Sequence, residues 1–186
     1  MSKYVSRGKL VSLRVAQKED VPLLVKWRNN PRVRNNHIYR EDFTVDGQLA
    51  WMEREVGSGR AIQFIICENS FDGETRAEGA EEDFRPIGCV HYQSIDREEG
   101  TAEYGIYIGE DDATGKGYGS EAAELALEYA RDVLGLKHVI LRVFAFNKAA
   151  IGSYVHAGFE KIQDLPQVEC SDGQKDDMIL MEKNLT

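Results

Sequence analysis

The stretch "TGKGYGSEA", residues 114–122, holds three glycines within five positions and leads directly into helix-forming residues. Glycine permits tight turns and a close approach of the backbone to a ligand, because it has no Cβ. The first N–H groups of a helix lack intrahelical partners and carry the positive end of the helix dipole. A strand, a glycine turn and a helix in this order therefore predict an anion site, and the rest of the chain must identify the anion.

The segments around this loop are predicted to form strands and helices. Period-two alternation predicts strands, and apolar residues at helical spacing predict helices. The glycine-containing, acidic segment 69–84 is expected to be a solvated hairpin loop. Asp46 is expected to cap the second helix and Gly135 to close the helix after the glycine loop. The expected strands are 9–15, 61–68, 86–96, 100–109, 137–147, 159–165 and 175–185, and the expected helices are 18–30, 47–56, 120–135 and 148–158.

This order predicts a mixed sheet covered by helices, which is a single α/β domain over residues 1–186. Three phosphate ligands compete for its glycine loop. A P-loop requires Lys followed by Ser or Thr, but Gly117 follows Lys116. A dinucleotide fingerprint requires a later third glycine, where this chain has Ser120, and an acid at the end of the next strand, which reads "VFAFN". The diphosphate of coenzyme A is the third candidate.

Four stretches match one known family in order. "TGKGYG" fills the glycine positions of the signature [QR]-x-x-G-x-[GA] and departs from it at Thr114. The other matches are "WRNNPRVR" (27–34), "LRVFAFNKAAIGSYVHAGF" (141–159) and "DGQKDDMILM" (172–181). The chain thus resembles the GCN5-related N-acetyltransferase (GNAT) family, in the subgroup of ribosomal-protein and polyamine acetyltransferases. The resemblance implies a GNAT-like domain with a central, mostly antiparallel, twisted sheet and helices on both faces.

The resemblance also implies a binding site for acetyl-CoA as co-substrate. The glycine loop would hold the diphosphate, and backbone groups of one strand would pair with the pantetheine arm. Asn147 would contact that arm or cap the following helix. The residues expected at this site are Thr114, Gly115, Lys116, Gly117, Tyr118, Gly119 and Ser120 for the diphosphate, and Ile106, Tyr107, Ile108 and Asn147 for pantetheine.

Two residues are expected to be catalytic by the same resemblance. Glu103 would draw the proton from the substrate amine, commonly through water; otherwise it is an exposed carboxylate on an alternating strand. An alkylammonium has a pKa of about 10 and needs such a base near neutral pH. Tyr154, seven residues after Asn147, would protonate the departing thiolate; otherwise its ring packs on the sheet.

Composition excludes several partners. The net charge is −9 and no stripe of Lys and Arg is visible, so we expect no nucleic acid. The longest apolar runs are too short to cross a membrane and the N-terminus lacks a signal-peptide core, so we expect a cytoplasmic protein. Cys67, Cys89 and Cys170 are expected to be reduced thiols. The histidines, His37, His91, His138 and His156, lack metal-ligand spacing, so no metal is expected.

These observations predict an acetyl-CoA-dependent N-acetyltransferase in which the amine attacks the thioester directly. Segment 27–42 is expected to shape the acceptor side, where Glu41, Asp42 and the acidic loop before Phe84 would attract a cation. A small cationic amine such as a polyamine is therefore favoured, with a protein N-terminus or an amino-sugar as alternatives. A non-catalytic acyl-CoA-binding module and a nucleotide-dependent oxidoreductase are the rival classes, and a homodimer is left open.

Overall fold

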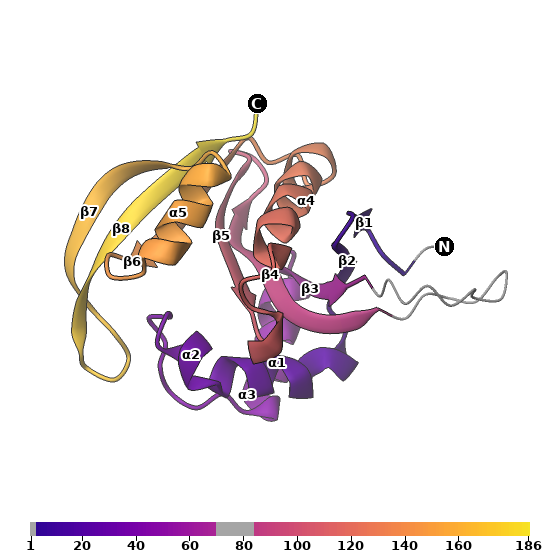
Figure 1. The fold of residues 1–186 in the computed structure, drawn as a ribbon, viewed down its shortest axis with the longest axis horizontal. Coiled ribbons are helices and arrows are strands. Elements are labelled where there is room, and N and C mark those ends of the chain that lie inside the picture. The colour runs from indigo at the N-terminus through magenta and orange to yellow at the C-terminus, as the bar shows by residue number, and fades with distance from the viewer. Residues whose placement is uncertain (1–2, 70–83) are drawn as a thin grey trace, which may run out of the picture.

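The computed structural model describes residues 3–69 and 84–186, and its strands form one eight-stranded sheet (Figure 1). The strand order is β1-β2-β3-β4-β5-β6-β8-β7, and only β5 and β6 run parallel. The strands are β1 Ser6–Arg7, β2 Val11–Val15, β3 Ile62–Glu68, β4 Arg85–Asp96, β5 Thr101–Ile108, β6 His138–Phe144, β7 Glu160–Glu169 and β8 Lys175–Asn184. The mostly antiparallel sheet is the one expected from the sequence.

The helices occupy the expected connections. They are α1 Val21–Asn29, α2 Pro31–Arg34, α3 Val45–Trp51, α4 Tyr118–Asp132 and α5 Lys148–His156. A π-helical turn, Met52–Val56, continues α3, and short 3-10 turns span Lys18–Asp20 and Asp111–Ala113. Strand β1 and helix α2 were not predicted from the sequence. Most of the predicted loop 69–84 lies outside the described residues.

One of the two predicted helix ends is wrong and the other is confirmed. Thr44, not Asp46, caps α3, because the Thr44 hydroxyl accepts a hydrogen bond from the Gly47 N–H at 3.1 Å while Asp46 lies inside the first turn. Gly135 closes the end of α4 as predicted: it has φ 69°, and the Leu136 N–H that follows it donates a hydrogen bond back to the Ala130 carbonyl at 2.9 Å.

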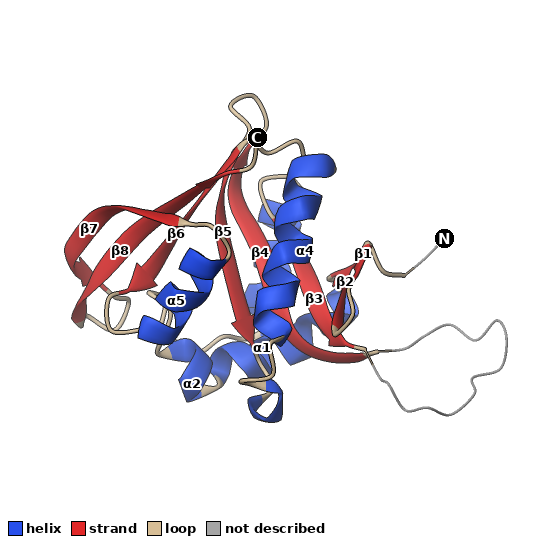
Figure 2. Cartoon of the chain, turned by 45° about the horizontal axis from the view of Figure 1, so that its top comes forward, coloured by secondary structure: helices blue, strands red, loops and turns tan. Residues whose placement is uncertain are grey.

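The sheet carries helices on both faces because its strands alternate buried side chains. On β3, Phe64 and Ile66 belong to the core that contains the alanines of α4, while Ile65 and Cys67 pack with Trp27 of α1. Figure 2 shows α4 running along one face of the sheet and α5 beside the strands β6 to β8. The alanines of α4 in this core are Ala122, Ala123, Ala126 and Ala130.

The parallel pair is the feature that creates a site. Strands β5 and β6 are in register only from Thr101 with His138 to Glu103 with Ile140. Beyond Glu103, β5 continues to pair with β4, and β6 continues to pair with β8. The sheet therefore opens between β5 and β6 at Tyr104.

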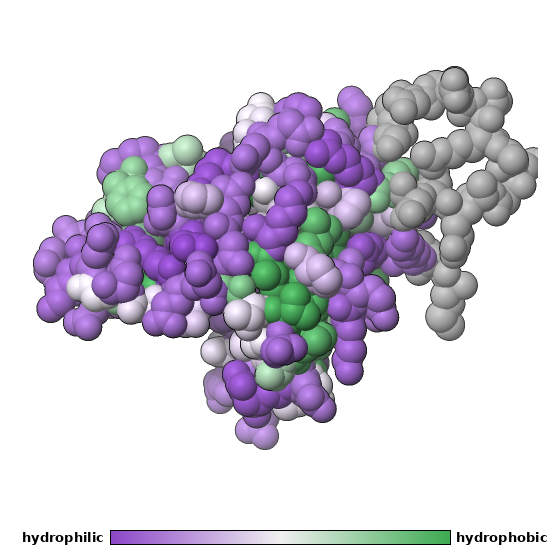
Figure 3. Space-filling view, turned by 90° about the horizontal axis from the view of Figure 1, so that it is seen from below, coloured by the Kyte–Doolittle hydropathy of each residue, from purple (hydrophilic) through white to green (hydrophobic). Residues whose placement is uncertain are grey.

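The surface fits the acidic composition. Figure 3 shows, from below, a largely hydrophilic face that surrounds one hydrophobic area near its centre. In the described ranges, no helix combines the length and the apolar character needed to span a membrane.

Candidate active site

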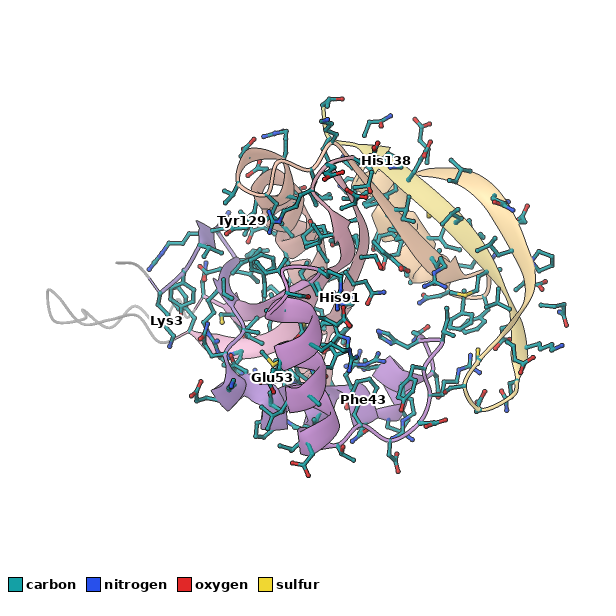
Figure 4. All side chains as sticks on the ribbon, turned by 180° about the vertical axis from the view of Figure 1, so that it is seen from behind. Lys3, Phe43, Glu53, His91, Tyr129 and His138 are labelled. Atoms are coloured by element: carbon teal, nitrogen blue, oxygen red, sulfur yellow. The ribbon has the colours of Figure 1, made fainter. Side chains whose placement is uncertain are left out.

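A cavity of about 820 Å³ lies where β5 and β6 diverge. Its lining comes from β4, β5 and β6, from the α1 to α3 region and from α5. Six of the sequence-predicted residues line it: Glu103, Ile106, Tyr107, Ile108, Asn147 and Tyr154. Figure 4 shows His91, which also lines it, facing the opening between the sheet and the loop before α3 that carries Phe43. Residues far apart in the sequence thus meet at one site.

Glu103 stands at the last paired position of β5 with β6. Its Oε1 accepts a hydrogen bond from Arg142 Nε at 2.9 Å and forms an ion pair with Nη2 at 2.8 Å. Its Oε2 accepts one from Gln93 Nε2 at 3.2 Å. The side chain is 19% exposed. Strands β4 and β6 thus each supply one partner that fixes the carboxylate in the cavity wall.

Tyr154 of α5 both packs and lines the cavity. Its ring meets those of Tyr104 and Phe159 edge-on, with centroids 6.4 Å and 5.8 Å away. Burial raises the pKa of Tyr154 to about 12, because the phenolate would lose its hydration. The hydroxyl therefore stays protonated at neutral pH and can donate a hydrogen bond.

The glycine loop has the expected backbone geometry. Gly115 and Gly117 adopt φ values of 72° and 82°, which residues with a Cβ rarely adopt. Across residues 3–69 and 84–186, no acceptor is found for the backbone N–H groups of positions 115–120. No loop residue lines the cavity, but Ile108 does. A Cβ built on Gly119 of the loop would lie 3.9 Å from Ile108 Cγ1. The loop therefore borders one end of the cavity.

The side chains of the loop hold it in place. Thr114 donates a hydrogen bond to the Asp111 carbonyl at 2.9 Å and closes the preceding 3-10 turn, which accounts for a threonine at this position. The Tyr118 hydroxyl donates to Glu68. The Lys116 ammonium lies 5.9 Å from the centre of the Tyr118 ring. Ser120 lies in the first turn of α4.

The open edge of β5 is only partly available to a ligand. The Ile108 carbonyl already accepts a hydrogen bond from Arg32 at 3.0 Å, so one of its two acceptor positions is used within the chain. Asn147 does not end β6, which stops at Phe144. Its side chain caps α5 by accepting from the Ala150 N–H at 3.1 Å, and its amide donates to Asn36 at 2.8 Å.

The motif at 27–34 braces the segment between β5 and the glycine loop. Trp27 Nε1 donates to Glu110 at 2.8 Å, and its ring is fully buried. A Cβ on Gly109 would fall 2.1 Å from the Trp27 ring, so only glycine fits there. Arg32 pairs with Asp111 at 2.8 Å. The motif thus sets the position of the loop as well as one wall of the cavity.

Two histidines in the lining were not predicted. The His91 ring lies over Gly105, where a Cβ would be 2.4 Å from His91 Cε1. Burial, and after it the charge of Arg28, lowers the pKa of His91 to about 4 and that of His37 to about 3. Both rings are therefore neutral at pH 7. A glycine inside strand β5 was the one sequence signal for this close packing.

The donors present suit acetyl-CoA. Unpaired N–H groups at the start of α4 are a site for a diphosphate, and the positive φ values let it approach the backbone. The edge of β5 beyond Glu103 has no neighbouring strand and can pair with an amide-containing arm. Over the described ranges, no three His, Cys, Asp or Glu side chains gather in a way that could hold a metal ion.

Comparison with known proteins agrees with this geometry. A family model described as an acetyltransferase (GNAT) domain matches residues 11–160. An uncharacterized N-acetyltransferase p20 of Bacillus licheniformis is 25% identical over 172 residues, which cover 91% of this chain and 90% of that protein.

Solved structures share the fold. Spermidine N-acetyltransferase from Vibrio cholerae, in complex with CoA and spermine, has a TM-score of 0.80 at 20% identity and covers 96% of this chain and 97% of its own. A dodecameric structure of that enzyme has a TM-score of 0.75 at 20% identity, with 96% and 95% covered. The family match spans most of the described sheet, the cavity and the glycine loop. The chain therefore belongs to the GNAT acetyltransferase family.

Proposed function

We propose that residues 1–186 act as a single N-acetyltransferase domain that transfers the acetyl group of acetyl-CoA to a primary amine by direct attack. The observation that carries this proposal is the meeting of Glu103, Tyr154 and the open edge of β5 in one cavity that ends at the glycine loop. Acetyl-CoA, when bound, supplies the activated acetyl thioester. Residues of the chain position the two substrates and move the protons.

Glu103 removes the proton from the amine, directly or through water. An alkylammonium of pKa about 10 is about one part in a thousand free amine at pH 7, and only the free amine is a nucleophile. The carboxylate is held by Arg142 and Gln93 and lines the cavity. This fixed position supports its role as the base.

Tyr154 stabilises the departing thiolate by a hydrogen bond. With a pKa of about 12, it is a weaker acid than a typical thiol, whose pKa is about 8.5. Complete proton transfer from the phenol to the thiolate is therefore uphill. The role we assign is a positioned donor, which is smaller than full general-acid catalysis.

A small cationic amine such as a polyamine is the first acceptor class to test, because the Vibrio cholerae enzyme of the same fold was solved with spermine. The expected acidic attraction is reduced in this chain. Asp42 lines the cavity but pairs with Arg34 at 2.6 Å, and Glu41 accepts from Tyr39. The acidic residues before Phe84 lie outside the described ranges. A protein N-terminus and an amino-sugar remain alternatives.

The direct test is a screen for thiol release from acetyl-CoA in the presence of polyamines, amino-sugars, aminoglycosides and basic N-terminal peptides. We expect turnover with at least one amine class and loss of most of it in Glu103→Gln. Binding of acetyl-CoA with no turnover for any amine would instead support the non-catalytic binding module.

Assembly and location are part of the proposal. A homodimer is the assembly that we propose to test first by light scattering, and the dodecamer of the Vibrio cholerae relative makes a larger assembly its alternative. We place the protein in the cytoplasm without nucleic-acid or membrane partners, on the strength of its net charge of −9 and its lack of long apolar runs.

A further inference from the structure

Arg28 of α1 lines the cavity without a polar partner. Its Nη1 atom is buried and makes no hydrogen bond, and no ion pair or side-chain hydrogen bond of Arg28 is found within residues 3–69 and 84–186. A guanidinium carries five N–H donors and stays charged at all working pH values. Burying such a charge without a partner is costly, so a partner that enters with the substrate is the economical explanation.

The other arginines of the lining differ from Arg28 because each has an ion-pair partner. Each of them is held by a carboxylate of the chain: Arg32 by Asp111 at 2.8 Å, Arg54 by Glu55 at 2.8 Å and Arg142 by Glu103 at 2.8 Å. The acids of the lining, Asp42 and Glu103, are likewise engaged, by Arg34 and Arg142. Within the described lining, Arg28 therefore carries the positive charge that remains uncompensated.

The guanidinium is also held in place. Its central carbon lies 4.5 Å from the centre of the Phe43 ring, and Phe43 itself lines the cavity (Figure 4). A cation that stacks on an aromatic face keeps its edge N–H groups free for a ligand. The neighbouring rings of His37 and His91 are neutral at pH 7, so they supply no counter-charge.

Arg28, Glu103 and His91 line the same cavity. Both charged groups act on the His91 ring, Arg28 by lowering its pKa and Glu103 by raising it. His91 therefore lies within electrostatic reach of both. An acceptor whose amine approaches Glu103 can reach Arg28 with its other end inside the same cavity.

We propose that Arg28 binds a carboxylate of the acceptor, so that the acceptor is an amino carboxylate in preference to an unsubstituted polyamine. This inference rests on the proposed amine acetyltransferase function. A planar guanidinium matches a carboxylate through two parallel hydrogen bonds, whereas a second ammonium placed beside Arg28 would be repelled. The carboxylate belongs either to a free amino acid or to an acidic residue near a peptide N-terminus.

The experiment compares acceptors that differ only at the end distant from the amine. Linear ω-amino acids, their primary amides and the diamines of equal chain length are assayed for kcat/KM by thiol release, at several chain lengths. A peptide arm compares peptides with aspartate or asparagine as the second residue, which separates the two sources. We expect wild type to prefer one carboxylate series over its amides by about 10-fold to 100-fold, since a site built for a polar group rejects analogues that lack it.

Arg28→Met keeps the length of the side chain and removes the charge, and it should abolish this preference. Arg28→Lys should restore part of it as a point charge, and Arg60→Met, which removes a guanidinium held by Glu55 at 3.0 Å outside the cavity lining, should keep all of it. Equal rates for carboxylates and amides in wild type, or a preference that survives in Arg28→Met, would overturn the proposal.

A binding measurement separates this proposal from the proposed function. Calorimetric titration with the N-acetylated ω-amino acids, which cannot accept an acetyl group, should show binding that weakens at least 10-fold in Arg28→Met. Binding that depends on Arg28 without turnover of any amine would refute the acetyl transfer and keep the carboxylate site. Turnover of diamines without any binding of the acetamido acids would refute the carboxylate site and keep the acetyl transfer.

Discussion

The first three residues of β5 and its last five behave as different structures. Residues 101–103 all pair with β6, and Thr101 and Glu103 also pair with β4, whereas 104–108 pair with β4 alone. Every buried backbone N–H and C=O group needs a partner. The site is therefore made by the missing neighbour of a strand more than by unusual residues on it.

Side chains from other elements hold this opening in shape. Arg142 on β6 reaches Glu103 at the point where the strands part, and the His91 ring covers Gly105 just beyond it. At the far end, Trp27 lies against Gly109 and bonds Glu110. The doubly paired part of β5 therefore anchors the base, and the open part offers its edge to a ligand.

Glu103→Gln should give the largest effect, because it changes the chemistry at the boundary between the two parts of β5. The amide cannot accept a proton, so kcat/KM for the amine should fall about 10²-fold to 10⁴-fold near neutral pH. Activity should partly recover at high pH, where free amine is present without a base. The measurement is a kcat/KM profile from pH 6 to 9.

Glu182→Gln is the matched control for this variant, since Glu182 bonds His138 at 2.8 Å and does not line the cavity. It should keep wild-type kinetics. If Glu103→Gln follows the wild-type profile over the whole pH range, another base or bulk water removes the proton.

Gly117→Val should weaken acetyl-CoA binding by about 10-fold or more. Gly117 lies in the glycine loop, beyond the open part of β5 and away from its doubly paired residues. Gly117 has φ 82° as the residue before α4, and a branched side chain there strains the backbone that presents the N–H groups. Calorimetric titration of the folded variant measures the change. Gly152→Ala, in the open middle of α5, is the control and should bind normally.

Wild-type affinity in folded Gly117→Val would mean that the diphosphate does not lie on this loop. The open edge of β5 would then need another role. Circular dichroism of both variants checks that the fold is kept.

Tyr154→Phe tests the side chain that faces the open part of β5 and should lower the rate of thiolate release by about 10-fold. The ring contacts with Tyr104 and Phe159 remain, so acetyl-CoA affinity should be unchanged. The defect should shrink when the leaving thiol is more acidic, because a better leaving group needs less stabilisation. A decrease of equal size for every thiol would mean that the hydroxyl only positions the thioester.

Lys116→Ala should have the smallest effect, less than about threefold in acetyl-CoA affinity at physiological salt. The Lys116 side chain is exposed, and exposed charges contribute little in water. Titration at two salt concentrations checks this. A loss as large as that of Gly117→Val would show that the ammonium, and not the backbone, holds the phosphate.

Much of this fold could be predicted because it depends on local signals. Alternation on β3 and β5, the alanine-rich face of α4 and the glycine loop each encode their own structure. The placing of Glu103, Tyr154 and Asn147 in one cavity agrees with the order of motifs in the sequence. The cap of α3 was mispredicted because Thr44 and Asp46 are both capping residue types, and only the backbone geometry chooses between them.

Local signals in the sequence were sufficient to predict most of the elements in order, the bend at Gly115 and Gly117, and a carboxylate on β5. Two features emerge only from the folded chain: β5 and β6 part after Glu103, and among the arginines of the described lining Arg28 is left without a carboxylate. The two sets of features differ in the sequence range of the interactions that produce them. Backbone turns and amphipathic periods arise within a few residues, whereas ion pairs such as Arg142 with Glu103 join strands far apart in the chain. The charges that are left unpaired can therefore be identified only from the folded structure.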